Sequence, residues 1–338
     1  MDRDKRKERL TLLLFIGLTA AIGIIAVISV CVGKYEIAPG EILDIATGKQ
    51  VASMTRKVFF NLRLPRTAMT VIAGSGLGVA GCVYQIIFKN PLASPDMIGV
   101  AAGANLGAAI AIVAVSSSGM FAIATGAFWG GLTAVFGVML LVKVTSSHSM
   151  ATYVLAGIVI NAVSKAIIMA LKYYADPEGE LATMEYWEMG TFGNTTLSKL
   201  LAVLPMFLIG MAGVLLLRRQ VELMALSDNE CRALGVRLRP IRGAILLLST
   251  LMVASVISVT GLISFAGLIA PHTARLLLKK NDGETMMMSG FVGALLVMGA
   301  DIFARVLYSS ELPISILTSI IGVPVLVYFM CKRGKEKP

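Results

Sequence analysis

Ionisable residues inside apolar segments are the first places in this sequence to look for chemistry. Lys165, Asp301 and Arg305 each lie within a long run of apolar residues. A charge in such surroundings is costly, so it is found where it serves transport, proton transfer or pairing with another charge. Asp301 and Arg305 are four residues apart, so they would share one helix face and can form an ion pair. Two interpretations stay open, a structural pair and a role in transport.

The residue patterns of common enzyme and nucleotide sites do not occur in the sequence. No Gly-x-x-x-x-Gly-Lys is followed by Ser or Thr, so any ATP and its Mg ion must be bound by a partner chain. There is no His-Glu-x-x-His and no Gly-x-Ser-x-Gly, and His148 and His272 are far apart. Residues 76–81 match the dinucleotide fingerprint formally, but they lie inside an apolar segment with no preceding strand. We therefore expect no catalytic residue, no metal site and no cofactor in this chain, which would not be an enzyme.

The composition is that of a membrane protein. Hydrophobic residues make up 57% of the 338 positions and charged residues 15%, whereas soluble domains carry about a quarter charged residues. The net charge of +10 does not indicate a nucleic-acid partner, because the Lys and Arg residues lie at the ends of apolar runs. Crossing the hydrocarbon takes about 20 apolar residues. Such segments lie near 11–32, 67–88, 97–115, 120–142, 151–171, 199–217, 240–260, 261–278, 286–307 and 312–331. The sequence thus predicts an all-α transmembrane bundle of about ten helices in membrane lipid, with residues 1–338 as one domain.

Turn residues decide two of these divisions. Residues 97–142 and 243–271 each run without a charge, and we expect reversals at Ser116–Gly119 and at Gly261. Glycines within the spans recur at spacings that place them on one helix face, which permits close helix packing. They are Gly74 and Gly78, and then Gly99, Gly103 and Gly107.

The distribution of Lys and Arg predicts the orientation. Cytoplasmic loops carry the excess of these residues, so the basic N-terminus and the basic C-terminal tail both lie inside, in agreement with an even number of spans. The acidic loop at 176–188 then faces outward. One segment disagrees with this rule, because residues 34–66 would be external. Its basic residues include Lys49, Arg56, Lys57, Arg63 and Arg66.

Four stretches carry more information than the spans. The first joins Arg63-Leu64-Pro65-Arg66 to Asn90-Pro91-Leu92-Ala93-Ser94-Pro95, whose prolines make a rigid loop. The second surrounds Pro271, which cannot donate to the carbonyl of Gly267, so we expect a helix to break or start there. The third runs from Asp301 to Arg305 and on to Glu311-Leu312-Pro313 and Gly322-Val323-Pro324. The fourth is the polar cytoplasmic stretch Leu226 to Gly235.

In this order and at these separations, from about Arg63 to Pro324, the motifs resemble the FecCD-type permease family. These proteins are the membrane subunits of ABC importers for iron-siderophores, haem and cobalamin. The resemblance implies a ten-helix subunit with the type II, cobalamin-permease-like fold, in the bacterial cytoplasmic membrane with both termini in the cytoplasm. It also implies three kinds of partner: a second permease copy or homologue, two ATP-binding subunits and an extracytoplasmic substrate-binding protein. The expected function is import by alternating access, powered by the partner ATPase.

The resemblance also implies roles for single residues. Arg63, Arg66 and Arg305 match external arginines that receive acidic residues of the binding protein, which would explain the basic segment on the outer side. Charge pairing of this kind steers docking and sets its register. Asn90 and Leu92 match positions that line the cytoplasmic gate, beside the loop that contains His148.

The coupling to the ATPase is expected at residues 222–238, between the sixth and seventh spans. The matching positions are Leu226, Ser227, Glu230, Arg232, Leu234 and Gly235. The segment is about two residues shorter than the family's usual pattern, which leaves the details of its contacts with the ATPase open. Ser315 stands where the family has Gly after Glu-Leu-Pro, which should leave the fold unchanged.

Two other classes of protein stay as alternatives. An ion-coupled secondary transporter needs carboxylates near the midplane of the membrane, where Asp301 is almost the only candidate. A membrane enzyme would need catalytic groups that the sequence lacks. The motifs leave the identity of the chelate open, as well as the choice between a homodimer and a heterodimer.

Overall fold

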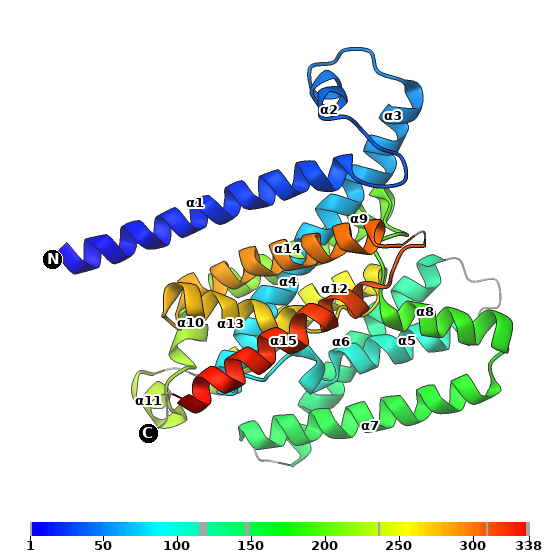
Figure 1. The fold of residues 1–338 in the computed structure, drawn as a ribbon. Coiled ribbons are helices and arrows are strands. Elements are labelled where there is room, and N and C mark those ends of the chain that lie inside the picture. Colours follow the sequence, from blue (N-terminus) through cyan, green and yellow to red (C-terminus); the bar gives the residue numbers. More distant parts are fainter. Residues whose placement is uncertain (1, 115–119, 146–148, 236, 309, 336–338) are drawn as a thin grey trace.

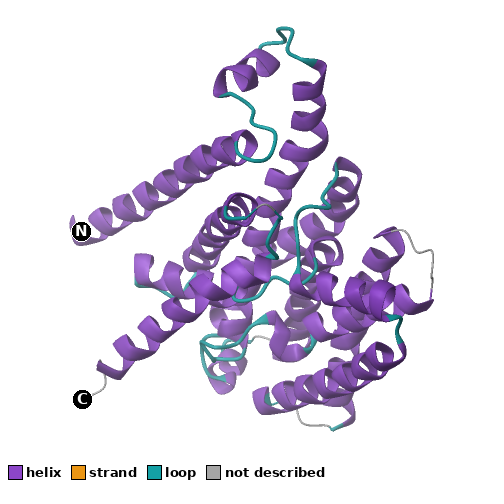
Figure 2. Ribbon diagram, turned by 45° about the vertical axis from the view of Figure 1, so that its right-hand side comes forward, coloured by secondary structure: helices purple, strands orange, loops and turns teal. Residues whose placement is uncertain are grey.

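The computed structural model describes residues 2–114, 120–145, 149–235, 237–308 and 310–335, and within them it contains helices and loops without a strand (Figure 2). The longer helices are α1 (Asp2–Cys31), α4 (Leu64–Ile87), α5 (Val100–Ala114), α6 (Met120–Val144), α7 (Met150–Tyr174), α9 (Leu197–Leu216), α12 (Leu238–Thr260), α13 (Ala266–Leu278), α14 (Gly283–Val306) and α15 (Ile314–Lys335). The short ones are α2 (Pro39–Ala46), α3 (Ser53–Val58), α8 (Ala182–Met189), α10 (Arg218–Leu223) and α11 (Asp228–Ala233), with single turns at Phe59–Arg63, Pro95–Ile98 and Pro177–Leu181.

The ten longer helices coincide with the ten predicted spans. Seven of the described helical stretches are long and apolar enough to cross a membrane, and α5 and the Ile314–Phe329 part of α15 are shorter apolar helices. Only α13, with 13 residues, is markedly shorter than its predicted span of 261–278. The prediction of an all-α bundle of about ten helices is confirmed.

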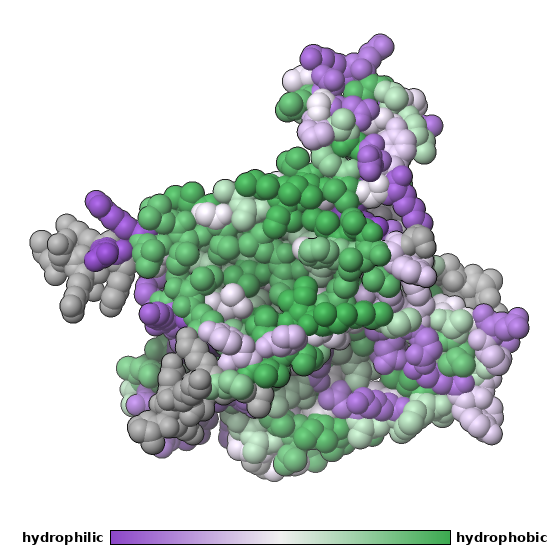
Figure 3. All heavy atoms as spheres, viewed as in Figure 1, coloured by the Kyte–Doolittle hydropathy of each residue, from purple (hydrophilic) through white to green (hydrophobic). Residues whose placement is uncertain are grey.

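The helices run roughly side by side, so the molecule has two distinct ends (Figure 1). The N-terminus, α10, α11 and the last described residues lie at one end, and α2, α3 and α8 lie at the other. Apolar residues cover the face in Figure 3 between these ends, while hydrophilic residues gather at the ends and on the protruding α2 and α3. This is the surface of a protein whose middle faces hydrocarbon. After the orientation and the coupling segment predicted from the sequence, we call the end with α2, α3 and α8 the outer end and the other the coupling end.

Side-chain caps start several helices. The Ser149 hydroxyl accepts a hydrogen bond from the Thr152 amide at the start of α7, at 3.2 Å. A carboxylate oxygen of Asp282 does the same for the Thr285 amide at the start of α14, at 3.0 Å. These oxygens satisfy amide groups that the first turn of a helix leaves without a partner.

Close helix packing occurs at the glycines that the sequence singled out. A Cβ atom at Gly74 or Gly78 of α4 would collide with the backbone of α14, and one at Gly103 or Gly107 of α5 would collide with the backbone of α6. Such contacts let helices associate without a hydrophobic driving force from water. Gly99 is an exception, because it lies in the loop before α5 rather than in a helix.

The structure differs from the sequence prediction at two helix ends. Residues 53–87 form one continuous helical stretch of 35 residues, longer than the predicted span 67–88 and containing a π-helical turn at Phe59–Arg63. The break predicted at Pro271 is wrong in position. The helix begins at Ala266, after the left-handed Phe265, and Pro271 lies inside it. The reversal predicted at Gly261 is confirmed by a positive φ of 69°, whereas Ser116–Gly119 falls within 115–119, outside the described residues.

Candidate functional site

Arg66 of α4 lies between two carboxylates at the outer end of the bundle. Its Nη2 is 2.9 Å from Oδ1 of Asp301 on α14, and its Nη1 is 2.9 Å from Oε1 of Glu311. The Asp301 side chain is 1% exposed and that of Glu311 34% exposed. Two carboxylates on one guanidinium make use of its planar set of donors, so they fix α4 against α14 and the loop that follows it.

Arg305 shares Asp301 with Arg66 and also reaches the first helix. Its Nη2 lies 3.2 Å from Asp301 Oδ2, which confirms the pair expected from their spacing. Its Nη1 donates to the carbonyl oxygens of Ser29 and Val32, both at 3.0 Å. Ser29 lies in the last turn of α1 and Val32 directly follows the helix, where a helix end has acceptors without partners. Arg305 thus holds the outer end of α1 on α14.

Arg63 is the third basic residue of this group. Its Nη2 donates to the carbonyl oxygen of Tyr35 at 3.1 Å, and its buried Nε has no hydrogen-bond partner among the described residues. We call Arg63, Arg66, Asp301, Arg305 and Glu311 the ionic cluster. Three cations and two carboxylates leave it with a net charge of +1.

The structure brings the three predicted docking arginines together but buries them. Arg63 and Arg66 are 8% exposed and Arg305 is 7% exposed. Docking to a binding protein is not tested by this geometry, so it stays a prediction. Sequence reasoning missed Glu311 and Ser29 as members of the same network. The Glu-Leu-Pro motif pointed to Glu311 without assigning it a partner.

The ionic cluster also bears on the alternative of an ion-coupled transporter. Such a transporter needs a carboxylate that can exchange a proton or a cation near the midplane. Asp301 instead lies at the outer end of α14, where it accepts hydrogen bonds from Arg66 and forms an ion pair with Arg305. Its negative charge is already used to hold helices together.

The predicted gate residues lie in the loop between α4 and α5, residues 88–99. Asn90 Oδ1 accepts a hydrogen bond from the Leu92 amide at 2.9 Å, which folds the loop into an Asx turn. Leu92 is 53% exposed. The loop thus presents an apolar side chain near the coupling end, where the neighbouring Lys89 pairs with Asp228.

Gln85, just before this loop, connects it to α13. Its Nε2 donates to the carbonyl oxygen of Leu268 at 3.3 Å, and its Oε1 accepts from Arg275. His272 Nδ1 lies 2.9 Å from the same Leu268 carbonyl. Pro271 has no amide hydrogen, so the nearby Gly267 carbonyl is free of its usual helical partner, and Gly81 of α4 packs closely against it.

The predicted coupling segment forms a small capped helix. Ser227 precedes α11, and its hydroxyl accepts from the Glu230 amide at 3.2 Å, while a Glu230 carboxylate oxygen accepts from the Ser227 amide at 2.7 Å. This reciprocal pair is a capping box. Its hydrogen bonds from Ser227 lower the pKa of the exposed Glu230 carboxyl below its ordinary value. Gly235 follows the helix with a positive φ of 76°, which suits a glycine after a helix end.

The outward surface of this segment combines apolar and charged groups. Leu226 is 39% exposed and Leu234 is 61% exposed, with the exposed Glu230 and Arg232 between them. Cys231 points inward instead, where its Sγ lies 3.0 Å from the carbonyl oxygen of Leu223. An exposed surface of this composition is suited to a protein partner.

Asp228 joins the coupling segment to the rest of the bundle. Its carboxylate lies 3.2 Å from Arg242 Nη2 on α12 and 3.5 Å from Lys89 Nζ in the gate loop. Glu222 of α10 accepts a hydrogen bond from the Gly283 amide at the start of α14, at 2.6 Å. A displacement of this segment therefore acts on α12, α14 and the loop that holds Asn90.

The described residues contain no group of three or more His, Cys, Asp or Glu side chains placed to hold a metal ion. The geometry is that of a bundle with an outer ionic cluster, a loop folded by an Asx turn and a capped surface helix. A model of the FecCD transport family matches residues 20–332 of the sequence. The chain belongs to this family.

Two transport permeases and one solved transporter structure are similar over most of the chain. The molybdate import system permease protein MolB of Haemophilus influenzae is 35% identical over 326 residues, which cover 94% of this chain and 96% of MolB. The hemin transport system permease protein HmuU of Yersinia pestis is 32% identical over 289 residues, covering 83% and 85%. A solved inward-facing structure of a metal-chelate type ABC transporter superposes with a TM-score of 0.85 at 32% identity, covering 95% of this chain and 99% of the other.

The FecCD match and these relatives establish the general function. The chain is a membrane-spanning permease subunit of an ABC importer, and the matches support this interpretation and not the alternative of an ion-coupled secondary transporter. Members of this family work with ATPase and substrate-binding partners.

Proposed function

We propose that this chain forms half of the pathway through which a metal chelate enters a bacterial cell, driven by ATP hydrolysis in a partner subunit. MolB is named for molybdate, HmuU for hemin and the solved neighbour for a metal chelate. Each of these three cargo names denotes a metal centre that is bound by surrounding ligand atoms. An iron-siderophore, or a related chelate such as haem or cobalamin, is the cargo class that we propose.

The observation that carries the pathway is the irregular backbone between α12 and α13. A helix of 13 residues rises only about 20 Å, whereas the hydrocarbon is about 30 Å thick. Residues 262–264, between the capping Gly261 of α12 and Phe265 before α13, therefore reach membrane depth without helical hydrogen bonds. Such backbone occurs only where it is buried in protein or lines a water-filled cavity. A cavity of about 250 Å³ lies beside it, lined by Ser94, Asp96 and Ser264 among others.

Cysteine labelling tests this placement. Ser264→Cys and Ser94→Cys should react with a small, charged, membrane-impermeant thiol reagent in the assembled transporter, with labelling that changes when ATP is trapped. Ser249→Cys is the matched control, because Ser249 is fully buried on α12 and outside the cavity. Ser264→Cys labelling no faster than Ser249→Cys would contradict the proposed pathway.

The ionic cluster and the basic residues above it form the proposed docking surface for an extracytoplasmic binding protein. Arg63, Arg66 and Arg305 give the cluster its net positive charge, and an acidic residue of the partner can replace Glu311 on Arg66. The exposed Arg56 and Lys57 of α3 lie on the protruding part of the same end. They would speed the encounter, because rim charges act mainly on the association rate.

The docking proposal is tested by the association rate of the substrate-binding protein. Arg56→Glu with Lys57→Glu should slow association, and the difference should shrink as salt is added. Arg218→Glu with Arg219→Glu, the same change of charge at two exposed residues of α10 at the opposite end, serves as the control. Equal rates for the two variants would remove α3 from the docking surface.

At the opposite end we propose that Asn90 and Leu92 form part of the cytoplasmic gate. Leu226, Ser227, Glu230, Arg232, Leu234 and Gly235 would seat in an ATP-binding subunit. The assembly would contain a second permease copy, two ATP-binding subunits that hold ATP and Mg, and one binding protein. The coupling end, which holds both termini and α11, would then face the cytoplasm, and the chain would lie in the inner membrane. Co-purification with the ATPase checks this assembly. The wild-type chain should bring down the ATPase, and the double variant Leu226→Asp with Leu234→Asp should not.

A further inference from the structure

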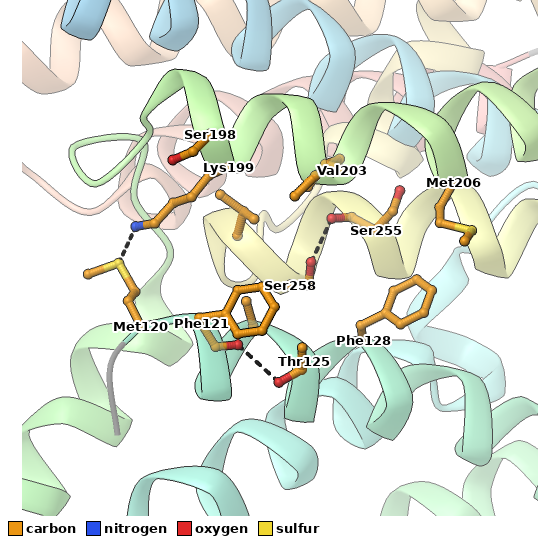
Figure 4. A pocket seen from close by; sticks show the side chains of 13 residues that line it. Met120, Phe121, Thr125, Phe128, Ser198, Lys199, Val203, Met206, Ser255 and Ser258 are labelled. Atoms are coloured by element: carbon orange, nitrogen blue, oxygen red, sulfur yellow. Dashed lines mark hydrogen bonds between the residues drawn. The ribbon is translucent and has the colours of Figure 1, made fainter. Parts of the chain in front are cut away.

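Helices α6, α9 and α12 enclose an apolar cavity of about 480 Å³ that the translocation proposal does not use (Figure 4). Phe121 and Phe128 come from α6, Ala202 and Met206 from α9, and Ser255 and Ser258 from α12. Phe121 is 76% exposed and Met206 is 41% exposed, so the cavity is a groove in the surface of the bundle. Its volume lies within the range of ligand sites, roughly 300–1,000 Å³.

The walls of this groove are less polar than their residues suggest. Ser255 donates its hydroxyl hydrogen to the Met252 carbonyl at 2.8 Å, and Ser258 donates to the Ser255 carbonyl at 2.7 Å. Thr125 donates to the carbonyl of Phe121 at 3.0 Å. These donors are already used within their own helices, so the groove offers mainly carbon atoms to an occupant. An alkyl chain is the ligand that such a surface suits.

A single cation lies among the residues that line the groove. Lys199 Nζ donates to the Asn194 carbonyl at 2.7 Å and contacts Met120 Sδ. No carboxylate among the described residues lies within ion-pairing distance of it. Lys199 is the third residue of α9, so the positive end of a helix of 20 residues adds to its charge. An anionic group at the outer end of the groove would therefore contact the Lys199 ammonium and the positive end of α9.

The groove also has the depth and the surroundings of a lipid site. From Lys199 to Met206 it follows α9 for about 10 Å, from the helix end toward the middle of the bundle. A smaller cavity of about 80 Å³ shares Lys199 and continues beneath α8, where Tyr186 and Trp187 line it. Tyr and Trp are typical of the membrane interface. The neighbouring side chains Leu201 and Ile209 of α9 are more than half exposed, as expected of a surface that faces lipid.

We propose that this groove binds one phospholipid of the outer leaflet that carries a net negative charge. An acyl chain lies between α6 and α9, and the phosphate contacts the Lys199 ammonium and the start of α9. A zwitterionic phospholipid would fit the same groove but would gain less from Lys199, because its headgroup carries no net charge.

Native mass spectrometry of the purified protein tests this site. Wild type is incubated with phosphatidylglycerol or with phosphatidylcholine of identical acyl chains. We expect roughly five-fold tighter binding of one phosphatidylglycerol, the ratio that follows from about 1 kcal/mol per basic residue near a lipid surface. Lys199→Gln should abolish the preference, whereas Lys165→Gln, at an exposed lysine on α7, should keep it.

A second variant tests the groove separately from the charge. Ala202 is exposed and lines the groove, so Ala202→Phe fills it without entering the core of the bundle. This variant should lose the bound phospholipid at an unchanged melting temperature. Equal binding of the two lipids by wild type, a preference kept by Lys199→Gln, or full binding by Ala202→Phe would each overturn the proposal.

Discussion

The carboxylate of Asp228, at the start of α11, lies 3.5 Å from the ammonium group of Lys89, the residue just before Asn90. The same carboxylate lies 3.2 Å from Arg242 Nη2 on α12. One side chain of the coupling segment thus contacts two parts of the membrane bundle. Because Lys89 directly precedes the Asx turn of Asn90 and Leu92 in the same loop, movement of α11 has a short, direct route to the proposed gate.

Replacing Lys89 tests that route. Lys89→Met should lower the amount of substrate imported per ATP hydrolysed by up to about five-fold, because a partly exposed ion pair contributes about 0–1 kcal/mol. Proteoliposomes containing the assembled transporter provide the measurement. Lys280→Met is the control, since Lys280 pairs with Glu284 at the same end without contacting α11. Identical coupling ratios in the two variants would argue against this connection.

The ionic cluster should stabilise the protein through Asp301. Asp301→Asn removes the buried carboxylate shared by Arg66 and Arg305, and breaking a buried pair in this way costs about 3–5 kcal/mol. We expect a large fall in the melting temperature in detergent. Glu311→Gln should cause a smaller fall, because Arg66 keeps Asp301 and the Glu311 side chain is partly exposed. The reverse order would show that Glu311 is the main counter-charge.

Gly81 should tolerate no side chain. A Cβ atom there would collide with the carbonyl group of Gly267, whose backbone cannot shift without moving α13. Gly81→Ala should therefore reduce the yield of folded protein and lower its melting temperature. Gly299→Ala is the matched control, since nothing lies within 4 Å of a Cβ atom at that position. Similar stability of both variants would mean that α4 and α13 can separate at no cost.

The capping box of α11 should make this helix sensitive to acid. Folding lowers the pKa of the Glu230 carboxyl below its ordinary 4.5, mainly through hydrogen bonds from Ser227. The stabilisation is therefore complete above the unfolded pKa and is lost as the pH falls through the lower, folded value. Amide protection of residues 228–233, corrected for intrinsic exchange, should decline in that acidic window. Glu230→Gln should show no such decline, and a decline of equal size in that variant would refute the assignment.

The sequence predicted the parts of the fold that depend on local patterns. Apolar runs located the ten spans, and the spacing of Asp301 and Arg305 anticipated an ion pair within one helix. The contacts of Arg66 with Asp301 and Glu311 could not be anticipated, because they join residues separated by 235 and 245 positions. The burial of the three arginines depends on that same tertiary arrangement.

Hydropathy also concealed an irregular segment. Residues 243–271 are free of charge, so hydropathy predicts two complete helices joined by a sharp turn at Gly261. The structure places four further residues outside helix, ending at the left-handed Phe265. An apolar residue in extended backbone has the same hydropathy as one in a helix, and only the lost hydrogen bonds distinguish them.

The attachment of α1 by Arg305 has a consequence for how the protein is made. The bond from Arg305 to Ser29 spans 276 positions, so the first helix to enter the membrane gains its outer anchor only after almost the whole chain has been synthesised. Little of α1 is otherwise covered, with 11% of its apolar stretch buried. A ribosome-bound chain that ends before α14 would leave the last carbonyls of α1 without this partner. Attachment of the first helix at its outer end therefore requires that insertion of the chain is nearly complete.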